Sequence, residues 1–527
     1  MSQDRLASEV GAQVLREGGT ATDAAIATAF ALAVTHPLAG NIGGGGFLLA
    51  VDAGGAKDFY DFREMAPSKS HPRMFLIKGK YDPSMHHSGH RSAGVPGTVA
   101  GLYLAWTERG KLPWAVLIQP AVVLARDGFP ISKTLADALE GALPAFRKYP
   151  ASLAQFSKSG KPLREGDLLV QTDLANTLER IAAEGPKDFY SGKTAKLLLR
   201  EMRAGKGLIE ARDLKAYKPM KRVPVVGSYR GFEVIGAPPP SSGGIAVIES
   251  LNVLEGYDLG NMAWDSAPFV HLVSETLRRA FADRARFIGD PDFVKDMPLN
   301  RLISKEHADK LRHSISPGRA SKSSPNIFEW PIEGTETTHI SVVDREGNAV
   351  SLTYTLEQSF GSHIVVRGAG FLLNNEMGDF NAAPGMTDAR GLIGTQPNLA
   401  MPGKRMLSSM NPTIIAKDGK PWLITGSPGG RTIISTVLLT ILAAVDFGKS
   451  AQECVDAGRF HHQWLPDRIV IEKSMFNKTT LDALKTMGHS LAEVINQGRA
   501  QLILMEGGKW GAGADTLRWA DSAAVWE

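Results

Sequence analysis

Residues 337–344, which read Thr-Thr-His-Ile-Ser-Val-Val-Asp, alternate in the pattern of a β-strand that opens on two hydroxyl residues. Arg345-Glu346-Gly347 fits a three-residue hairpin loop with glycine at the left-handed position, and residues 348–356 alternate again as a returning strand. Pairing Asp344 with Asn348 places Thr337 opposite Thr355. We therefore expect the two hydroxyls to share one face of one sheet, where Thr355 can hydrogen-bond to the Thr337 hydroxyl and orient it.

Thr337 also follows the least regular part of the chain. Residues 314–336 contain three prolines and five serines and show no helical periodicity, which is typical of a linker or a surface loop. If the chain is cut before Thr337, the new α-amine becomes a base within reach of the residue's own hydroxyl. One residue then supplies both nucleophile and base. The alternative is an ordinary threonine at a strand start, which β-propensity also favours.

The overall composition is that of a globular protein. The chain has 527 residues, of which 43% are hydrophobic and 22% charged, and its net charge is +4. This length fits several domains or one large composite core. Basic residues are scattered and form no platform with aromatic residues, so nucleic acid is not expected as a partner. No apolar stretch is long enough to span a membrane.

Few residues have the spacing of metal ligands. The single Cys454 cannot form an internal disulfide and lacks partners for a metal site. His461 and His462 are neighbours on a predicted helix, so their side chains point apart, and no third ligand is spaced nearby. No metal site is expected.

Two glycine-rich segments precede regular elements. Residues 43–46 are four consecutive glycines before a predicted strand at 47–51, and they lack the Gly-Lys-Ser/Thr ending of a phosphate-binding loop, so close backbone packing is the favoured interpretation. Gly429 and Gly430 precede a helical run from about 432 to 445. Their consecutive N–H groups can point at one oxygen, as in an oxyanion hole. A Gly-Gly turn alone does not distinguish this arrangement from an ordinary turn.

Three further segments carry charged or hydroxyl side chains. Arg63, in Asp61-Phe62-Arg63-Glu64, can grip a carboxylate with two parallel hydrogen bonds or form a surface ion pair with Glu64. Glu376 and Asp379 place two carboxylates three residues apart in a predicted turn. Ser408-Ser409 offers two adjacent hydroxyls, or alternatively an ST-turn.

Taken in order along the chain, these segments resemble the gamma-glutamyltranspeptidases, N-terminal nucleophile hydrolases that cut themselves into a large and a small subunit. The resemblance covers almost the whole chain. Its motifs are Gly40-Asn41-Ile42 with the four glycines, residues 61–64, residues 238–244, Thr337-Thr338-His339, residues 407–410 and residues 426–430.

The resemblance implies a role for each candidate residue. Thr337 would be the nucleophile and new N-terminus, Thr355 its hydroxyl partner, and Gly429 and Gly430 the oxyanion donors. The substrate α-carboxylate would be held by Arg63, Ser408 and Ser409, and the α-ammonium by Glu357, Glu376 and Asp379. A zwitterionic γ-glutamyl group requires one cationic and one anionic pocket, which agrees with these residue types.

The resemblance also implies an α+β fold, a four-layer αββα sandwich built from both subunits of the self-cleaved chain. Residues 1–336 would form the large subunit and residues 337–527 the small one, after cleavage between Glu336 and Thr337. The implied enzyme transfers the γ-glutamyl group of glutathione or a related compound to water or to an amino acid or peptide amine. The transfer would pass through a γ-glutamyl-Thr337 intermediate and require no cofactor.

Two alternatives remain. An acylase of the same family would act on glutaryl-type cephalosporin side chains, which lack the α-ammonium and would leave Glu357, Glu376 and Asp379 unpaired. A non-catalytic relative would stay uncleaved.

Two further expectations concern the lid and the compartment. Arg390 stands where many bacterial members carry a gating tyrosine in a lid loop, which puts substrate gating in question. Because family members are usually exported, a periplasmic or secreted location is expected, although residues 1–6 open directly into an amphipathic helix. A cytoplasmic location is the alternative.

Overall fold

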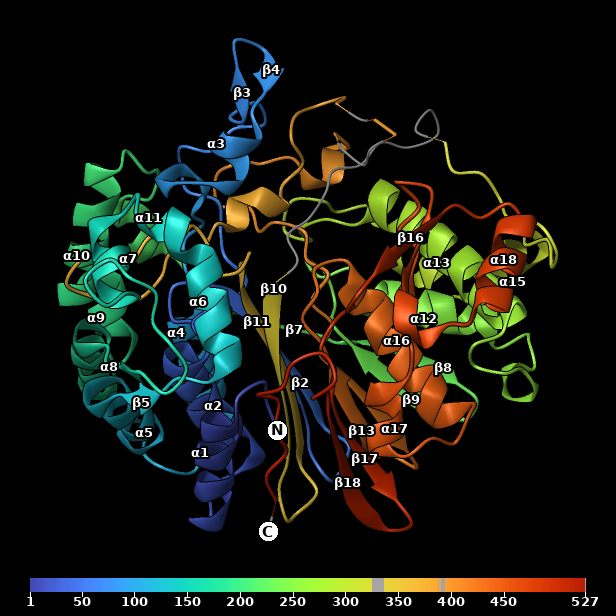
Figure 1. Ribbon diagram of the computed structural model, residues 1–527, viewed down its shortest axis with the longest axis horizontal. Coiled ribbons are helices and arrows are strands. Elements are labelled where there is room, and N and C mark those ends of the chain that lie inside the picture. Colours follow the sequence, from blue (N-terminus) through green and yellow to red (C-terminus); the bar gives the residue numbers. More distant parts are fainter. Residues whose placement is uncertain (325–335, 387, 390–393, 527) are drawn as a thin grey trace.

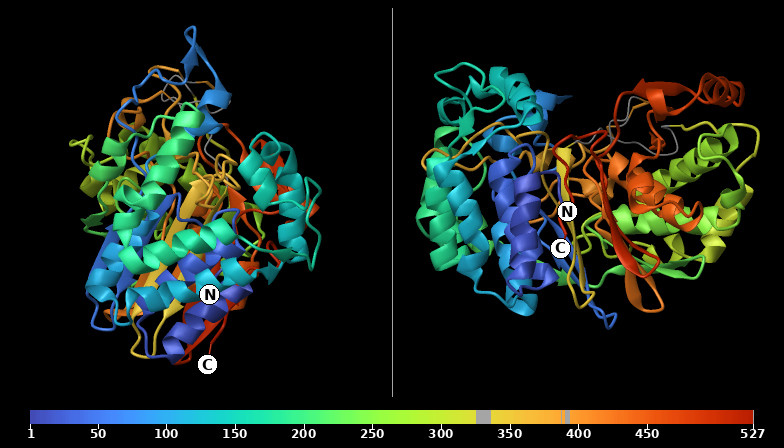
Figure 2. Two further views of the ribbon diagram at one scale, coloured as in Figure 1. Left: turned by 90° about the vertical axis from the view of Figure 1, so that its left-hand side faces the viewer. Right: turned by 60° about the horizontal axis from the view of Figure 1, so that its bottom comes forward.

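The chain folds into four layers, in which helices cover the outer faces of two facing β-sheets (Figure 1, Figure 2). The computed structural model describes residues 1–324, 336–386, 388–389 and 394–526, and of Glu336 only the backbone. Helices from the first half of the chain cover one sheet, and helices from both halves cover the other. The predicted four-layer αββα sandwich is confirmed.

The two large sheets both combine strands from either side of residue 336. The first has the strand order β10-β11-β1-β2-β7 and the second β18-β17-β13-β12-β9-β8. The strands of the first sheet are β1 (Gly45–Val51), β2 (Lys57–Asp61), β7 (Met220–Arg222), β10 (Glu336–Val343) and β11 (Ala349–Glu357). Those of the second are β8 (Val225–Tyr229), β9 (Phe232–Gly236), β12 (Thr413–Lys417), β13 (Lys420–Gly426), β17 (Gln501–Glu506) and β18 (Lys509–Ala514).

The outer layers are helical. The first contains α1 (Arg5–Arg16), α2 (Ala21–Thr35), α4 (Thr98–Arg109), α5 (Trp114–Asp127), α6 (Lys133–Phe146), α7 (Pro150–Gln155), α8 (Thr172–Glu184), α9 (Pro186–Ser191), α10 (Lys193–Ala204) and α11 (Ala211–Ala216). The other contains α12 (Gly243–Leu254), α13 (Ala267–Phe287), α14 (Leu299–Leu302), α15 (Lys305–His313), α16 (Thr432–Val445), α17 (Ala451–Asp456) and α18 (Lys478–Thr486).

Smaller elements lie at the rim of the sandwich. They are α3 (Pro83–His87) beside the hairpin of β3 (Leu76–Ile77) and β4 (Lys80–Tyr81), the pair β5 (Phe129–Pro130) and β6 (Leu168–Leu169), and the sheet of β14 (Phe460–His461), β15 (Ile469–Glu472) and β16 (Leu491–Val494). Single 3-10 turns are η1 (His90–Ser92), η2 (Leu259–Asn261), η3 (Glu376–Asp379), η4 (Gln396–Asn398) and η5 (Lys473–Met475). His461 therefore lies on a strand and not on the predicted helix.

Strand β1 shows how the sandwich is held together. Leu48 and Ala50 pack with the first helical layer, whereas Phe47, Leu49 and Val51 belong to the second core with helices α12, α13 and α16. Successive side chains of a strand point to opposite faces, so a strand between two cores must be apolar at every position. All seven residues of β1 are buried.

Helix α2 lies behind this sheet and is buried along its whole length. Its N-cap is Thr20. Asp23 completes a capping box with Thr20, in which each side chain accepts a backbone N–H of the other residue.

The four glycines at 43–46 lie where the chain enters β1. A Cβ on any of them would collide with a carbonyl oxygen of a neighbouring segment, that of Leu372, Thr355, Phe62 or Thr353 in turn. The interpretation as close backbone packing is confirmed. The packing draws the start of β1 against the end of β11, which carries Thr355 and Glu357.

The predicted hairpin is present. Gly347 adopts a left-handed φ of +86° in the loop, and the strands pair from Val343 with Ala349 to Thr338 with Tyr354 in the expected register. The register then shifts, because Glu336 pairs with Glu357, so Thr337 lies opposite a β-bulge formed by Thr355 and Leu356 of β11.

Parts of two predicted segments lie outside the described residues. In the proposed linker the structure describes residues 314–324, which form turns and no helix or strand, but not residues 325–335. Arg390 of the expected lid loop also lies outside the described residues. None of the helices that the structure describes combines the length and apolar character that a membrane crossing requires.

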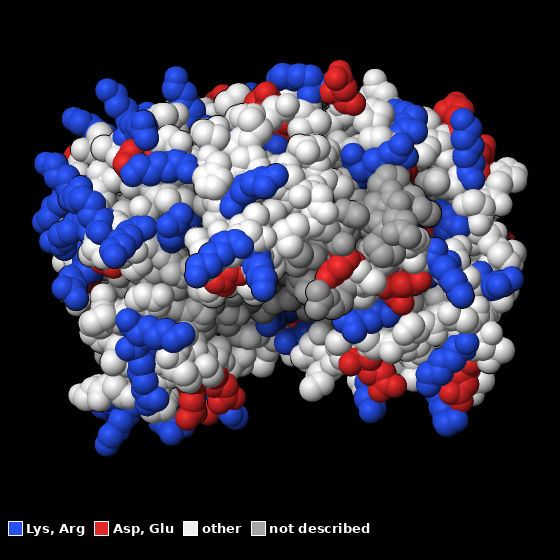
Figure 3. All heavy atoms as spheres, turned by 90° about the horizontal axis from the view of Figure 1, so that it is seen from above, with Lys and Arg blue, Asp and Glu red and all other residues white. Residues whose placement is uncertain are grey.

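The face above the strand ends carries an uneven charge. Lys and Arg side chains gather on the side built by α9 and α10 (Figure 3). The acidic side chains of the candidate site are largely buried and contribute little to this surface.

Candidate active site

Thr337 and Thr355 meet at the upper end of the first sheet. Thr337 Oγ1 donates a hydrogen bond of 3.3 Å to Thr355 Oγ1, which also accepts the backbone N–H of Glu357 at 2.8 Å. Both hydroxyl residues are buried. The expected hydroxyl contact is therefore present, although the bulge replaces the direct pairing of Thr337 with Thr355 that the hairpin register predicts.

The structure describes the uncleaved chain. Glu336 and Thr337 are consecutive residues of β10, so the Thr337 nitrogen is a peptide N–H. The geometry around Thr337 is consequently that of a continuous chain, in which the hydroxyl adjoins the peptide bond between Glu336 and Thr337.

One small cavity gathers almost all of the sequence-predicted residues. Its volume is about 20 Å³, roughly the space of one water molecule. It is lined by Arg63, Thr337, Thr355, Glu357, Glu376, Asp379, Ser408, Ser409, Met410, Gly430 and Ile433. These residues come from positions 63 to 433 of the chain, so the fold and not sequence proximity assembles them.

Gly429 is the predicted residue that does not line this cavity. It lies in the same turn as Gly430 before α16, but faces a neighbouring cavity with Pro428 and Thr432. Gly429 and Gly430 have φ of +135° and +55°, values that favour glycine. Neither backbone N–H donates a hydrogen bond to another described residue.

Arg63 is completely buried and holds the acidic residues together. Its guanidinium forms ion pairs with Glu376 and Asp379, and it donates to the carbonyl oxygen of Leu407 at 3.2 Å. Glu64 lies 3.7 Å away and is equally buried, so the surface ion pair considered for Arg63 and Glu64 is wrong. Arg63, predicted to bind the substrate carboxylate, is thus paired in the uncleaved chain with Glu376 and Asp379, which were predicted to bind the ammonium.

The acids of this cluster hold protons more tightly than exposed acids do. Burial raises the pKa of Glu357 and of Glu64 to about 7 and that of Glu376 well above its usual range, although the Arg63 charge acts in the opposite direction. Glu357 Oε2 and Glu376 Oε2 are buried and have no hydrogen-bond partner among the described residues. A bound ammonium group would supply the missing donors.

Glu357 also has an unusual backbone. Its φ of +82° lies in the left-handed region, which residues other than glycine seldom adopt. The strain of such a residue, about 1 to 3 kcal/mol, persists only where the surrounding structure imposes it. Glu357 is the last residue of β11 and follows the bulge that lies opposite Thr337.

The two serines are held by different partners. Ser408 Oγ accepts the backbone N–H of Met410 at 3.0 Å, and Ser409 Oγ accepts a hydrogen bond of 3.0 Å from Arg284. Arg284 also donates to Ser242 Oγ at 2.6 Å. Sequence reasoning missed Arg284, because nothing in the helical spacing of α13 distinguishes it from a surface arginine.

Two clusters could hold a metal ion, and neither contributes to the cavity at Thr337. In the described residues these are His271 with Glu275 and His489, and Glu249 with Asp283 and His307. The carboxylate of Glu275 is already paired with Arg278 at 3.0 Å and Arg279 at 2.8 Å. Sequence reasoning did not identify either cluster, because each combines residues that are distant in sequence.

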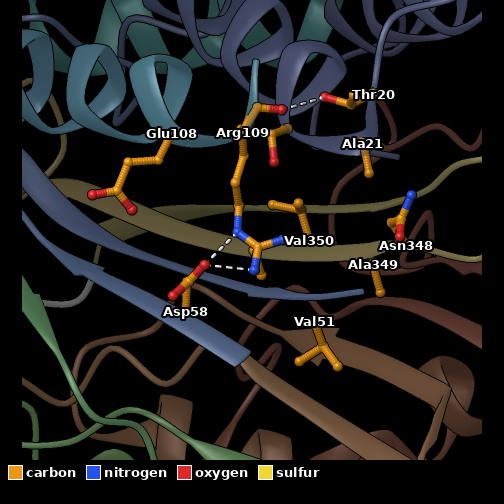
Figure 4. A pocket seen from close by; sticks show the side chains of 11 residues that line it. Thr20, Ala21, Val51, Asp58, Glu108, Arg109, Asn348, Ala349 and Val350 are labelled. Carbon is orange, nitrogen blue, oxygen red and sulfur yellow. Dashed lines mark hydrogen bonds and ion pairs between the residues drawn. The ribbon is translucent and has the colours of Figure 1, made fainter. Parts of the chain in front are cut away.

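A larger cavity of about 340 Å³ lies at the opposite end of β1 and β11 (Figure 4). Arg109 projects into it but is paired with Asp58 at 2.5 Å, and its carbonyl oxygen accepts the Thr20 hydroxyl at 3.1 Å. None of the residues predicted from the sequence to take part in the reaction lines this cavity, so it is not the candidate active site despite its size.

Comparisons with known proteins agree with this geometry. The family model described as Gamma-glutamyltranspeptidase matches residues 7–525. A glutathione hydrolase proenzyme of Escherichia coli K12 is 46% identical over 509 residues, which cover 96% of this chain and 87% of that protein. The solved structure of a cephalosporin acylase from Bacillus halodurans has a TM-score of 0.87 at 25% identity, over 100% of this chain and 95% of its own.

A second solved structure is more similar in sequence over a shorter length. It is the gamma-glutamyltranspeptidase of Helicobacter pylori, with a TM-score of 0.60 and 44% identity over 61% of this chain and 92% of its own. A family match over nearly the whole chain and an identity of 46% leave one conclusion: the chain belongs to the gamma-glutamyltranspeptidase family.

Proposed function

We propose that this protein is a gamma-glutamyltransferase and glutathione hydrolase that activates itself by cleavage before Thr337. The observation that carries the proposal is the meeting of a hydroxyl pair, a buried arginine and three carboxylates around one small cavity. Membership in the family supports the same reaction.

Self-cleavage would begin with attack of Thr337 Oγ1 on the carbonyl carbon of Glu336. The peptide C–N bond breaks, the hydroxyl proton ends on the Thr337 nitrogen, and Glu336 is left as an ester on the Thr337 oxygen. Water then hydrolyses the ester and releases residues 1–336 from residues 337–527. The hydrogen bond between Thr337 and Thr355 supports this step, because it holds the attacking oxygen beside the bulge.

The cleaved chain would use the same oxygen for catalysis. The new amine takes the Thr337 hydroxyl proton, Oγ1 attacks the γ-carbonyl carbon of the donor, and the N–H groups of Gly429 and Gly430 stabilise the oxyanion. The departing amine takes the proton as the C–N bond breaks. Water or the amine of an amino acid or peptide then attacks the γ-glutamyl ester and frees Thr337.

The charged groups support a donor that is a zwitterion at its α-carbon. Arg63, Ser408 and Ser409 supply donors for an α-carboxylate, and the unpaired oxygens of Glu357 and Glu376 supply acceptors for an α-ammonium. When a donor binds, its carboxylate would pair with Arg63 and its ammonium with the acidic residues. These contacts would replace the present ion pairs of Arg63 with Glu376 and Asp379. The cavity of the uncleaved chain must enlarge for this exchange.

The proposal is tested first by self-cleavage. The purified protein should run on a denaturing gel as fragments of 336 residues and, since 527 minus 336 is 191, of 191 residues. Thr337→Ala should leave one inactive chain, whereas Thr337→Ser keeps a hydroxyl and should still cleave. Maturation of Thr337→Ala at the same bond would show that another residue is the nucleophile.

A glutaryl acylase is the alternative, since the acylase structure is similar over the whole chain. Glutaryl-p-nitroanilide differs from γ-glutamyl-p-nitroanilide by the missing α-ammonium. An unpaired buried carboxylate costs about 1 to 3 kcal/mol, so kcat/KM for the glutaryl donor should be roughly ten- to a hundredfold lower. Asp379→Asn should bring the kcat/KM values of the two donors closer together. Equal kcat/KM for the two donors in the unsubstituted enzyme would favour the acylase.

We also propose an exported location, periplasmic or secreted, which the family membership alone supports. Fractionation of the source cells with a periplasmic marker enzyme tests it. Recovery of the processed protein with cytoplasmic markers would overturn this part of the proposal.

A further inference from the structure

His87 reaches the acidic cluster from outside the set of residues that line the cavity. It is the last residue of α3, a short helix that begins at Pro83 after the N-cap Asp82. This helix and the β3–β4 hairpin lie above the ends of β10 and β11 (Figure 1). His87 Nδ1 lies 3.2 Å from Glu357 Oε1.

The position of His87 is fixed from two sides. Its carbonyl oxygen accepts a hydrogen bond of 3.0 Å from Asn375, the residue before η3. A Cβ on Gly378 of η3 would collide with His87 Nδ1 and approach the Glu357 carboxyl carbon to 3.2 Å. The side chain of His87 is 18% exposed, whereas that of Glu357 is 1% exposed. The imidazole therefore bridges solvent and the buried carboxylate.

Other charged and titratable groups surround the pair. Two titratable residues lie on the same segment as His87. The rings of His86 and His87 have centroids 4.4 Å apart, and the Tyr81 hydroxyl lies 2.9 Å from His86 Nδ1. From η3 come Glu376 and Asp379, both paired with Arg63. The 3-10 turn η1 packs against α3 and contains Arg91, which is exposed, and His90. His90 Nε2 lies 3.0 Å from Glu201 Oε1. Among the described residues, His87 thus forms its ion pair with Glu357.

We propose that His87 is a positioning residue of the ammonium subsite, which keeps Glu357 ionised through Oε1 and leaves Oε2 for the α-ammonium of the donor. The inference rests on the proposed function, because it assigns Glu357 to the ammonium. Oε1 of Glu357 is occupied by His87, and Oε2 has no partner among the described residues. No residue of the cavity lining other than Glu357 contacts His87 in this way.

The charge of Glu357 depends on this contact. Burial raises the pKa of Glu357 to about 7, and the hydrogen bond and charge of His87 are the largest effects that lower it. Burial alone would lower the pKa of His87, but the hydrogen bond and charge of Glu357 outweigh it and raise that pKa. Without His87, Glu357 would bind a proton more tightly and be neutral at pH 7, so it would no longer attract an ammonium.

The test compares His87→Leu with the unsubstituted enzyme on two donors. At pH 7 the KM for γ-glutamyl-p-nitroanilide should rise roughly fivefold for a rise of about one unit in the Glu357 pKa, with kcat little changed. The difference should disappear by about pH 9, where Glu357 is ionised in both enzymes. The KM for glutaryl-p-nitroanilide, which has no α-ammonium, should not change.

Three further variants separate this role from a structural one. His87→Lys restores a cation and should recover part of the lost affinity. In a Glu357→Gln background, His87→Leu should raise KM no further, because the coupling between the two side chains is gone. His90→Asn removes a similar histidine–glutamate pair outside the cavity and should leave both donors unaffected.

Each outcome bears on the inference. An unchanged KM for the γ-glutamyl donor in His87→Leu, or an equal rise for both donors, refutes the role of His87 while the proposed function stands. An additive rise in the Glu357→Gln background refutes it as well. Absence of γ-glutamyl turnover in the unsubstituted, cleaved protein would remove the proposed function and the inference together.

Discussion

At the scale of single residues, the environment of Arg63 explains why the site is charged and yet buried. One guanidinium faces Glu64, Glu376 and Asp379, so the acids lose their hydration but keep a cation. A buried ion pair adds little net stability, but removal of one partner leaves an uncompensated charge that is costly. The cluster is therefore stable as a whole and vulnerable to the loss of Arg63.

Arg63→Ala should accordingly destabilise the protein by about 3 to 5 kcal/mol at pH 8. The loss should be smaller at pH 5. The carboxyl pKa of Glu64 is already raised in the folded state, and without Arg63 it would rise further, so protonation relieves the uncompensated charge as the pH falls. Thermal unfolding at both pH values measures the effect.

The matched control for this prediction is Arg126→Ala. Arg126 pairs with Glu179, but both side chains are at least 40% exposed, so its loss should cost about 1 kcal/mol or less. If the two variants unfold alike, or Arg63→Ala loses as much stability at pH 5 as at pH 8, then Arg63 does not balance the buried acids.

At the scale of elements, the turn before α16 contributes backbone and not side chains. Gly430 takes a left-handed φ of +55° and its N–H has no acceptor among the described residues. Helix α16 follows two residues later, and the positive end of its dipole faces the same region. The turn is therefore suited to an oxygen that becomes negative only during the reaction.

Gly430→Ala should lower kcat roughly tenfold or more with little change in KM, because a Cβ disturbs the donor at the oxyanion. Gly419→Ala is the control. Gly419 has a similar φ of +76° in the β12–β13 turn, and a Cβ there would meet nothing within 4 Å. Both changes should cost about 1 kcal/mol of stability from the backbone alone. An equal kcat in the two variants would remove Gly430 from the reaction.

At the scale of the whole molecule, the proposed cleavage divides the chain but not the fold. Strand β1 pairs with β11 along seven residues, and β9 pairs with β12, so each sheet joins segments from before and after residue 336. Near the termini, Ser2 and Ala523 also pair. Separation of the two proposed subunits would break both sheets and expose both cores.

We therefore expect the cleaved protein to elute from a size-exclusion column as one species of the same size as uncleaved Thr337→Ala. The fragments should separate only in denaturant, at the concentration where circular dichroism reports unfolding. Separate elution in buffer would show that the cores do not hold the two parts together.

The hairpin, the glycine packing and the family membership could all be predicted from the sequence. The period-two alternation on either side of Arg345-Glu346-Gly347 specified the hairpin and brought Thr337 near Thr355, because a tight loop and a strict alternation leave one register. The four glycines specified close packing, since only glycine tolerates backbone oxygens at that distance. The layered fold and the family followed from motifs in a fixed order along the chain.

The pairing of the charged residues in the site, in contrast, depends on the tertiary fold. Arg63, Glu376 and Asp379 are distant in sequence, and no local pattern shows that they pair with one another before a donor arrives. The bulge opposite Thr337, the Arg284 contact to Ser409 and the His87 contact to Glu357 likewise depend on which elements pack together. Local propensity specifies strands and turns. A buried charge is stable only when it is paired, and which residue pairs with it depends on which elements the fold packs together.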